Sequence, residues 1–137
     1  MAPETLRGEG VTEKSDVWSY GVTLWEIFSG AKCSPYNQYP DKDVIIYHIK
    51  HYEEWHKFNS YRLPLDIPEQ CPTSLQIIFT NCWRWKSEDR CNFEKIVSIL
   101  EQYLNLPESE QESSDQIRDQ FASECFFFIS VVKYRNS

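Results

Sequence analysis

Histidines and cysteines are the residues of this chain whose side chains could bind a metal ion. His48, His51 and His56 are near one another in the sequence, but they lack further ligands at the spacing of structural zinc sites. No C-x-x-C pair occurs among the five cysteines, which are at positions 33, 71, 82, 91 and 125. We therefore expect packed or solvated histidines, no metal site and no disulfide framework, as in a reducing compartment.

The net charge argues against a nucleic-acid partner. The 137 residues include 14 lysines and arginines and 21 aspartates and glutamates, which give a formal charge of -7. Such a chain has no general attraction for phosphate backbones or anionic lipids. Its longest apolar stretch, at 125–129, is far shorter than the ~20 residues of a membrane span. We expect neither a transmembrane segment nor a signal peptide.

Helical periodicity dominates the chain up to residue 105. A helix is predicted to begin at Ser15, whose hydroxyl can cap it, and to end near Gly30, with apolar side chains on nearly every face. Further helices are predicted over about 43–55, 72–83 and 92–104, the last of them capped by Asn92. The third and fourth helices carry apolar stripes at helical spacing, so they can pack together.

Three segments lack this pattern. Residues 31–43 are rich in proline, asparagine and tyrosine and predict an ordered loop. Residues 106–120 are rich in acids and predict a solvated linker. Residues 121–137 form an apolar tail with many β-forming residue types. This tail could cover the core, add a strand, or be non-native sequence from a mis-spliced end.

Motifs in a fixed order carry a resemblance to a known family. They are Met1-Ala2-Pro3-Glu4, Lys14-Ser15-Asp16-Val17-Trp18-Ser19-Tyr20-Gly21-Val22, Leu24-Trp25-Glu26, Cys82-Trp83, Arg90 and Phe93. Over residues 1–105 this order resembles the lower half of the C-terminal lobe of a protein kinase, in its tyrosine kinase form. The resemblance implies a mainly α fold of about four helices, without the β-sheet of the N-terminal lobe. Cys91 departs from the family, which has proline after the arginine.

The resemblance divides the chain into a partial kinase C-terminal lobe at 1–105, an acidic linker at 106–120 and the apolar tail at 121–137. It also implies a buried ion pair between Glu4 and Arg90, because an arginine fork suits a carboxylate. That pair would tie the end of the activation segment to the loop before the last helix. The alternative is two solvated surface charges.

Other motif residues receive structural roles by the same resemblance. Asp16 would hold the catalytic loop in relatives, but without that loop we expect a helix-start acid that interacts with the helix dipole. Trp18 and Trp83 are expected to pack in the core, and Gly21 belongs to the same motif as Trp18. Ala2 and Pro3 would border the peptide substrate, and the helix at 43–55 would offer a further docking surface.

Phosphoryl transfer needs groups that the sequence does not contain. The glycines, at 8, 10, 21 and 30, form no G-x-G-x-x-G loop, and there is no V-A-I-K lysine, H-R-D loop or D-F-G aspartate. We therefore predict no catalytic, cofactor-binding or metal-binding residue in this chain. ATP and magnesium are implied only for the complete parent domain.

The sequence thus indicates a partial protein tyrosine kinase domain whose parent would transfer the γ-phosphate of ATP to protein tyrosine. A catalytically inactive interaction module, a fragment of a tyrosine-kinase-like serine/threonine kinase, and a partial gene product are the alternatives. The expected partners are protein or peptide substrates, and the expected location is the cytoplasm or the cytosolic side of a membrane.

The first predicted helix also carries an expectation about stability. In a complete lobe, helices that precede Met1 would cover one side of residues 17–28. Without them, large side chains such as Trp18, Tyr20 or Leu24 would lie in water, and the tail could cover only part of that face. We therefore expect a loose chain that can self-associate through exposed apolar surface.

Overall fold

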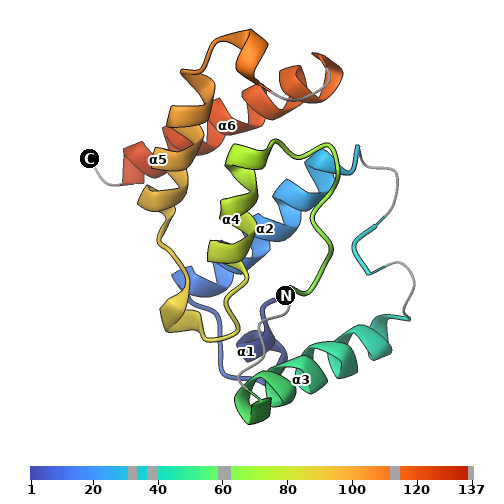
Figure 1. The fold of residues 1–137 in the computed structure, drawn as a ribbon. Helices are drawn as coiled ribbons and strands as arrows, with labels where there is room; N and C mark the ends of the chain where they lie inside the picture. The colour runs from blue at the N-terminus through green and yellow to red at the C-terminus, as the bar shows by residue number, and fades with distance from the viewer. Residues whose placement is uncertain (31–33, 37–39, 59–62, 112–114, 136–137) are drawn as a thin grey trace.

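The computed structural model describes residues 1–30, 34–36, 40–58, 63–111 and 115–135, with side chains except at 41, 55–58, 108 and 115–118. Among these residues there are helices and turns but no strand, so the mainly α prediction is confirmed. The α-helices, more than the four predicted, are α1 (Pro3–Leu6), α2 (Glu13–Phe28), α3 (Asp41–Phe58), α4 (Gln76–Cys82), α5 (Phe93–Leu104) and α6 (Asp115–Arg135) (Figure 1). Short 3-10 turns lie at Thr73–Leu75, Ser87–Asp89 and Glu108–Glu110.

Helix α2 begins earlier than predicted, and its cap is Thr12 instead of Ser15. The Thr12 hydroxyl accepts a hydrogen bond from the Ser15 backbone N–H at 3.4 Å, and the Ser15 hydroxyl accepts one from the Thr12 N–H at 3.1 Å. These reciprocal bonds form a capping box, which satisfies backbone groups on both sides of the first turn. The prediction that the helix starts at Ser15 was wrong because this hydroxyl caps the turn from inside the helix.

The other predicted helices are present with shifted ends. Helix α3 is longer than predicted and starts directly after Pro40, whose carbonyl accepts hydrogen bonds from the Asp43 and Val44 N–H groups. The 3-10 turn Thr73–Leu75 takes up the start of the third predicted helix. The Asn92 cap is confirmed, since its side chain accepts from the Lys95 N–H at 2.9 Å. The predicted loop at 31–43 was too long, because residues 41–43 belong to α3. Residues 31–33, which include Cys33, and 37–39 lie outside the described residues.

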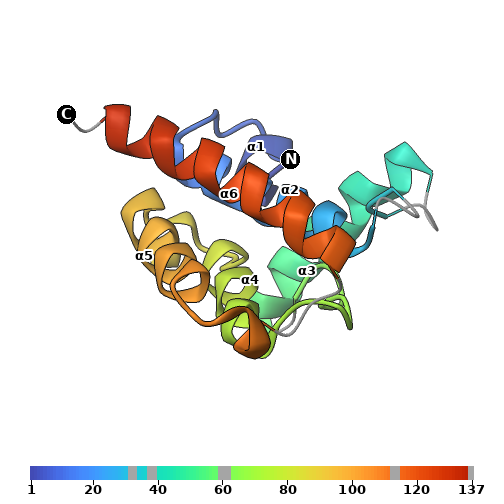
Figure 2. The same ribbon diagram turned by 90° about the horizontal axis from the view of Figure 1, so that it is seen from above.

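Helix α2 is the central element of the fold. It contacts α4 and α6, while α5 contacts α6 and α1 contacts α3. Figure 2 shows α6 crossing above α2 and alongside α5. The side chains of Trp18, Leu24 and Phe28 are almost fully buried. The expectation that Trp18 and Leu24 lie in water was therefore wrong.

The tail supplies the missing cover, as a helix. Phe121 contacts Phe28 with ring centroids 4.8 Å apart, and Phe128 stacks on Tyr20 at 4.2 Å. Burial raises the pKa of the Tyr20 hydroxyl above its ordinary value. Residues 121–135 thus cover the core as part of α6 and add no strand. Helix α6 also starts inside the segment predicted as a linker.

Helix α6 retains apolar side chains on its outer face. Phe126 and Phe127 are 61% and 70% exposed. Self-association through such surface stays a prediction. Among the described residues, every helix is too short or too polar to form a membrane span.

Candidate functional site

Arg90 is the most fully engaged side chain among the motif residues. Its Nη1 and Nη2 donate to Oε1 and Oε2 of Glu4 at 2.7 and 2.8 Å. Its Nε donates to the Arg84 carbonyl at 2.8 Å, Nη1 to the Lys14 carbonyl at 2.9 Å and Nη2 to the Trp85 carbonyl at 3.4 Å. The guanidinium thus has a partner for each N–H direction of its planar fork. Its side chain is fully buried, so this position requires arginine in particular.

Glu4 enters this junction from α1. Besides the arginine fork, its Oε1 accepts a hydrogen bond from the Ser15 hydroxyl at 3.0 Å. Burial acts to raise the pKa of Glu4, but the Arg90 hydrogen bonds and charge, with the Ser15 bond, outweigh it. The pKa of Glu4 therefore lies below its ordinary value of 4.5. The carboxylate remains charged at neutral pH and holds α1 to the loop before α5.

Lys14 adds a second tie between the start of α2 and the same loop. Its Nζ donates to the Arg90 carbonyl at 2.6 Å, and Arg90 Nη1 in turn donates to the Lys14 carbonyl. The Arg90 guanidinium also lies over the Trp18 ring, 5.0 Å from its centroid. The Glu4–Arg90 junction, by which we mean Glu4, Lys14, Ser15, Trp18 and Arg90, therefore joins three separate segments. Sequence reasoning missed Lys14 and Ser15, whose roles depend on a distant partner.

Trp83 fixes the packing of α4 on α2. Its indole Nε1 donates to the Trp18 carbonyl at 3.3 Å. A Cβ atom at Gly21 would come within 2.6 Å of that nitrogen, so glycine permits the close approach. Trp18, Gly21 and Trp83 thus lie together, and both tryptophans are buried.

Ala2 and Pro3 lie at the start of α1. Pro3 is at the first helical position, where its missing N–H has no cost. Ala2 is 1% exposed and Pro3 is also buried. Side chains this buried would influence a substrate through the backbone they position. Their assignment to the substrate segment stays a prediction.

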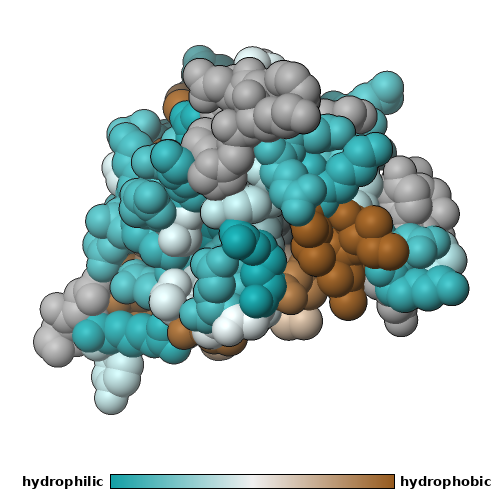
Figure 3. Space-filling model, turned by 90° about the horizontal axis from the view of Figure 1, so that it is seen from below, coloured by the Kyte–Doolittle hydropathy of each residue, from teal (hydrophilic) through white to brown (hydrophobic). Residues whose placement is uncertain are grey.

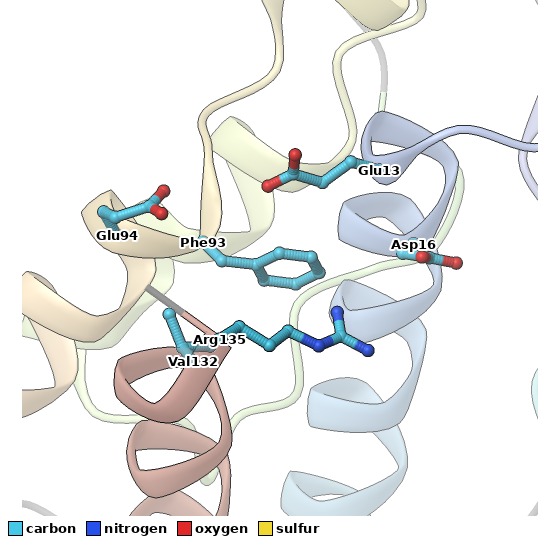
Figure 4. A pocket seen from close by; sticks show the side chains of 6 residues that line it. All are labelled: Glu13, Asp16, Phe93, Glu94, Val132 and Arg135. Carbon is cyan, nitrogen blue, oxygen red and sulfur yellow. The ribbon is translucent and has the colours of Figure 1, made fainter. Parts of the chain in front are cut away.

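Asp16 lies apart from the junction, on an exposed turn of α2. It lines a surface pocket that carries more acids than bases: Glu13, Asp16, Phe93, Glu94, Val132 and Arg135. Figure 4 shows the Arg135 side chain extending from α6 toward the first turn of α2. Asp16 is an acid in the first turn of α2, where negative charge is favourable, and its interaction with the helix dipole stays a prediction.

The histidines form part of an aromatic cluster. His48 is 1% exposed and meets Trp18 edge to face at 5.8 Å, while the His51 ring is stacked on Trp85 at 6.0 Å. Burial lowers the pKa of His48 to about 4. The His56 side chain lies outside the described residues. Among the residues that the structure describes, no group of three or more metal-ligating side chains is found.

Comparisons with known proteins give one consistent family. The family model "Protein tyrosine and serine/threonine kinase" matches residues 1–100. Ephrin type-A receptor 7 of Gallus gallus is 38% identical over 79% of the chain, and mitogen-activated protein kinase kinase kinase 12 of Rattus norvegicus is 38% identical over 74%. The chain spans about a tenth of the length of these relatives (10% of each). It belongs to the protein tyrosine and serine/threonine kinase family.

Proposed function

We propose that residues 1–105 act as the lower part of the C-terminal lobe of a protein tyrosine kinase. The complete domain would transfer the γ-phosphate of ATP to tyrosines of protein substrates, with ATP and magnesium held by residues outside this chain. The parent would act in the cytoplasm or on the cytosolic side of a membrane. The observation that carries the proposal is the bidentate contact between Glu4 and Arg90.

That contact supports a scaffolding role for the segment. It fixes Ala2 and Pro3, next to Glu4, against the body of the helices. A peptide substrate bound there would meet a rigid backbone, and positioning is most of what a kinase contributes to phosphoryl transfer. The Trp18 and Cys82-Trp83 motifs favour the tyrosine type. The match to both kinds of relative keeps a serine/threonine kinase of tyrosine-kinase-like type as the alternative.

A chimeric kinase tests the proposal. Residues 2–106 would replace the matching part of the kinase domain of ephrin type-A receptor 7. We expect ATP-dependent phosphorylation of a glutamate–tyrosine copolymer, and much weaker phosphorylation of a substrate that contains only serine and threonine. A folded chimera without phosphotyrosine activity would refute the proposal, and phosphorylation of serine alone would establish the alternative.

The unmodified chain provides the matched control. Because the nucleotide-binding and catalytic motifs are missing, we expect neither saturable ATP–magnesium binding in calorimetry nor turnover of the copolymer. Turnover by this chain would mean that the chemistry resides in residues we have assigned to structure.

One observation favours a second function, that of an interaction module. Figure 3 shows the underside of the molecule, where a hydrophobic area interrupts a mainly hydrophilic surface. Helix α3 lies on this side in Figure 1, and its exposed apolar residues include Ile45 and Ile46, which are 41% and 61% exposed. Binding of the chain to an array of tyrosine-containing peptides, lost on Ile46→Asp and kept in Lys50→Ala, would support this function.

A further inference from the structure

Two cysteine side chains meet beside the Glu4–Arg90 junction. Cys82 is the last residue of α4 and is fully buried, while Cys91 directly follows Arg90 and is partly exposed. The Cys91 N–H donates to the carbonyl of Asn81, the residue before Cys82, at 3.2 Å, so the backbone brings Cys91 beside Cys82. Each thiol also shifts the pKa of the other, as expected for neighbouring side chains.

The surroundings of the two thiols differ. The interaction with Cys82 lowers the pKa of Cys91, and nearby Lys14 and Lys95 act in the same direction against the effect of burial. Burial raises the pKa of Cys82 well above its ordinary value. The partly exposed sulfur is thus the one that becomes a thiolate, and the buried sulfur lies against it. This is the arrangement of a reactive cysteine with a resolving cysteine.

We propose that Cys82 and Cys91 form a site of reversible oxidation, in which a hydroperoxide converts the two neighbouring thiols into a disulfide. The family assignment does not enter this proposal. It rests on the backbone contact that brings Cys91 beside Cys82 and on the access of Cys91 to solvent.

The reaction has two balanced steps. The Cys91 thiolate attacks the terminal oxygen of the peroxide, the O–O bond breaks, and the leaving oxide takes up a proton to form water or an alcohol. Cys91 is now a sulfenic acid. The Cys82 sulfur then attacks the Cys91 sulfur, the S–O bond breaks, and the departing hydroxide takes up the Cys82 proton to form a second product, water. Overall, two thiols lose two electrons and two protons, and the peroxide is reduced.

Two other cysteines lack these features. Cys71 is buried in the loop before the turn Thr73–Leu75, Cys125 is buried on α6, and burial raises the pKa of Cys71 to about 12. Burial also raises the pKa of Cys125. They are therefore suitable internal controls, because both thiols are buried and burial raises the pKa of each.

Peptide mapping of the oxidised chain tests the proposal. The reduced 137-residue chain would be treated with hydrogen peroxide, alkylated with N-ethylmaleimide, digested with trypsin and analysed by mass spectrometry without reduction. We expect tryptic peptides 63–84 and 91–95 to be joined, and dithiothreitol to separate them. The mass of the intact chain should fall by that of the two thiol hydrogens.

Substitution of single cysteines shows which two residues form the disulfide. Peptide 63–84 contains both Cys71 and Cys82. Cys82→Ala and Cys91→Ser should each abolish the joined peptide, whereas Cys71→Ala should leave it unchanged. Cys71→Ala leaves Cys82 as the one cysteine of peptide 63–84, so a joined peptide in this variant assigns the bond if Cys82→Ala fails to fold. A joined peptide that persists in Cys82→Ala, or oxidation of Cys91 to sulfinic acid without any joined peptide, would overturn the proposal.

Discussion

The two ends of α2 are held by opposite kinds of contact. At its start, the Glu4–Arg90 junction is polar and directional, with each donor matched to a defined acceptor. At its other end, α6 covers Leu24 and Phe28 through apolar surface and aromatic contacts, such as the Phe28–Phe121 pair. The polar contact fixes one geometry, whereas the contact with α6 buries apolar surface area. Register and stability are thus provided by different parts of one helix.

The difference has an energetic basis. A buried ion pair recovers little more than the cost of removing its charges from water, but loss of one partner is strongly destabilising. Apolar burial is not directional and contributes in proportion to the area removed from water. We therefore expect α6 to contribute more to the total free energy of unfolding, and the junction to be more sensitive to single substitutions.

The largest effect is expected from removal of α6. A chain that stops after residue 106 would expose Leu24, Phe28 and much of Tyr20, at a cost of about 1.5–3 kcal/mol for each large side chain. Urea denaturation should show a much lower midpoint, and the shortened chain should bind a hydrophobic dye. Lys133→Ala is the control, because the Lys133–Glu101 ion pair lies on the surface of α6 with both side chains exposed. An unchanged urea midpoint without α6 would show that the apolar surface buried by α6 is not needed for stability.

Substitution of Arg90 should give the next largest effect. Arg90→Ala leaves the Glu4 carboxylate in a largely dry site, and the expected loss is about 3–5 kcal/mol of unfolding free energy. Arg90→Lys keeps the charge but not the fork, so it should recover only part of the loss. In a double-mutant cycle with Glu4→Ala, measured by urea denaturation, the double variant should lose much less than the sum. Additive losses would place the two charges in independent environments.

Gly21→Ala tests how tightly α4 is packed on α2. The added Cβ would lie 2.6 Å from Trp83 Nε1, and the expected cost is about 1–3 kcal/mol, since overpacking forces neighbours to shift. Trp83→Phe removes that nitrogen, so in this background Gly21→Ala should cost less than it does beside the tryptophan. Thermal melts of the four proteins of the cycle would measure this. Equal costs in both backgrounds would mean that the strain lies elsewhere.

The smallest expected effect is a change in how stability depends on pH. The pKa of Glu4 is lower in the folded chain than its ordinary value of 4.5, so the unfolded chain takes up the proton first as pH falls. The stability that Glu4 contributes is therefore present above pH 4.5 and is lost as pH falls through its folded pKa. Glu4→Gln should be less stable at neutral pH and lose less stability below pH 4.5 in chemical denaturation. Parallel pH profiles of the two chains would contradict this assignment.

The sequence predicted the Glu4–Arg90 junction better than it predicted the packing of α6 on α2. Glu4 and Arg90 stand in motifs whose order resembles a known family, so their pairing could be expected without any geometry. Lys14 and Ser15 belong to the same stretch, but their contacts run to a distant backbone carbonyl and a distant carboxylate. Such contacts leave no periodic signal, because they depend on how separate segments meet.

The tail shows how a local pattern can mislead. Its run of phenylalanine, isoleucine and valine suggested β-structure, since these types fit a pleated surface. The buried residues are Phe121, Cys125, Ile129 and Val132, whose spacing is that of one face of a helix. That spacing was present in the sequence. It could have identified the helix, but only the presence of an apolar face on α2 explains why the helical form prevails.

The Glu4–Arg90 contact spans 86 positions of the chain, and the Lys14–Arg90 contact spans 76. Closing such long loops is entropically costly, so contacts of this kind form late in folding, after nearby helices have met. A late contact is absent from the transition state, and its loss accelerates unfolding without slowing refolding. The ion pair would therefore govern the lifetime of the folded chain, and hence its exposure to proteolysis, more than the speed at which it folds.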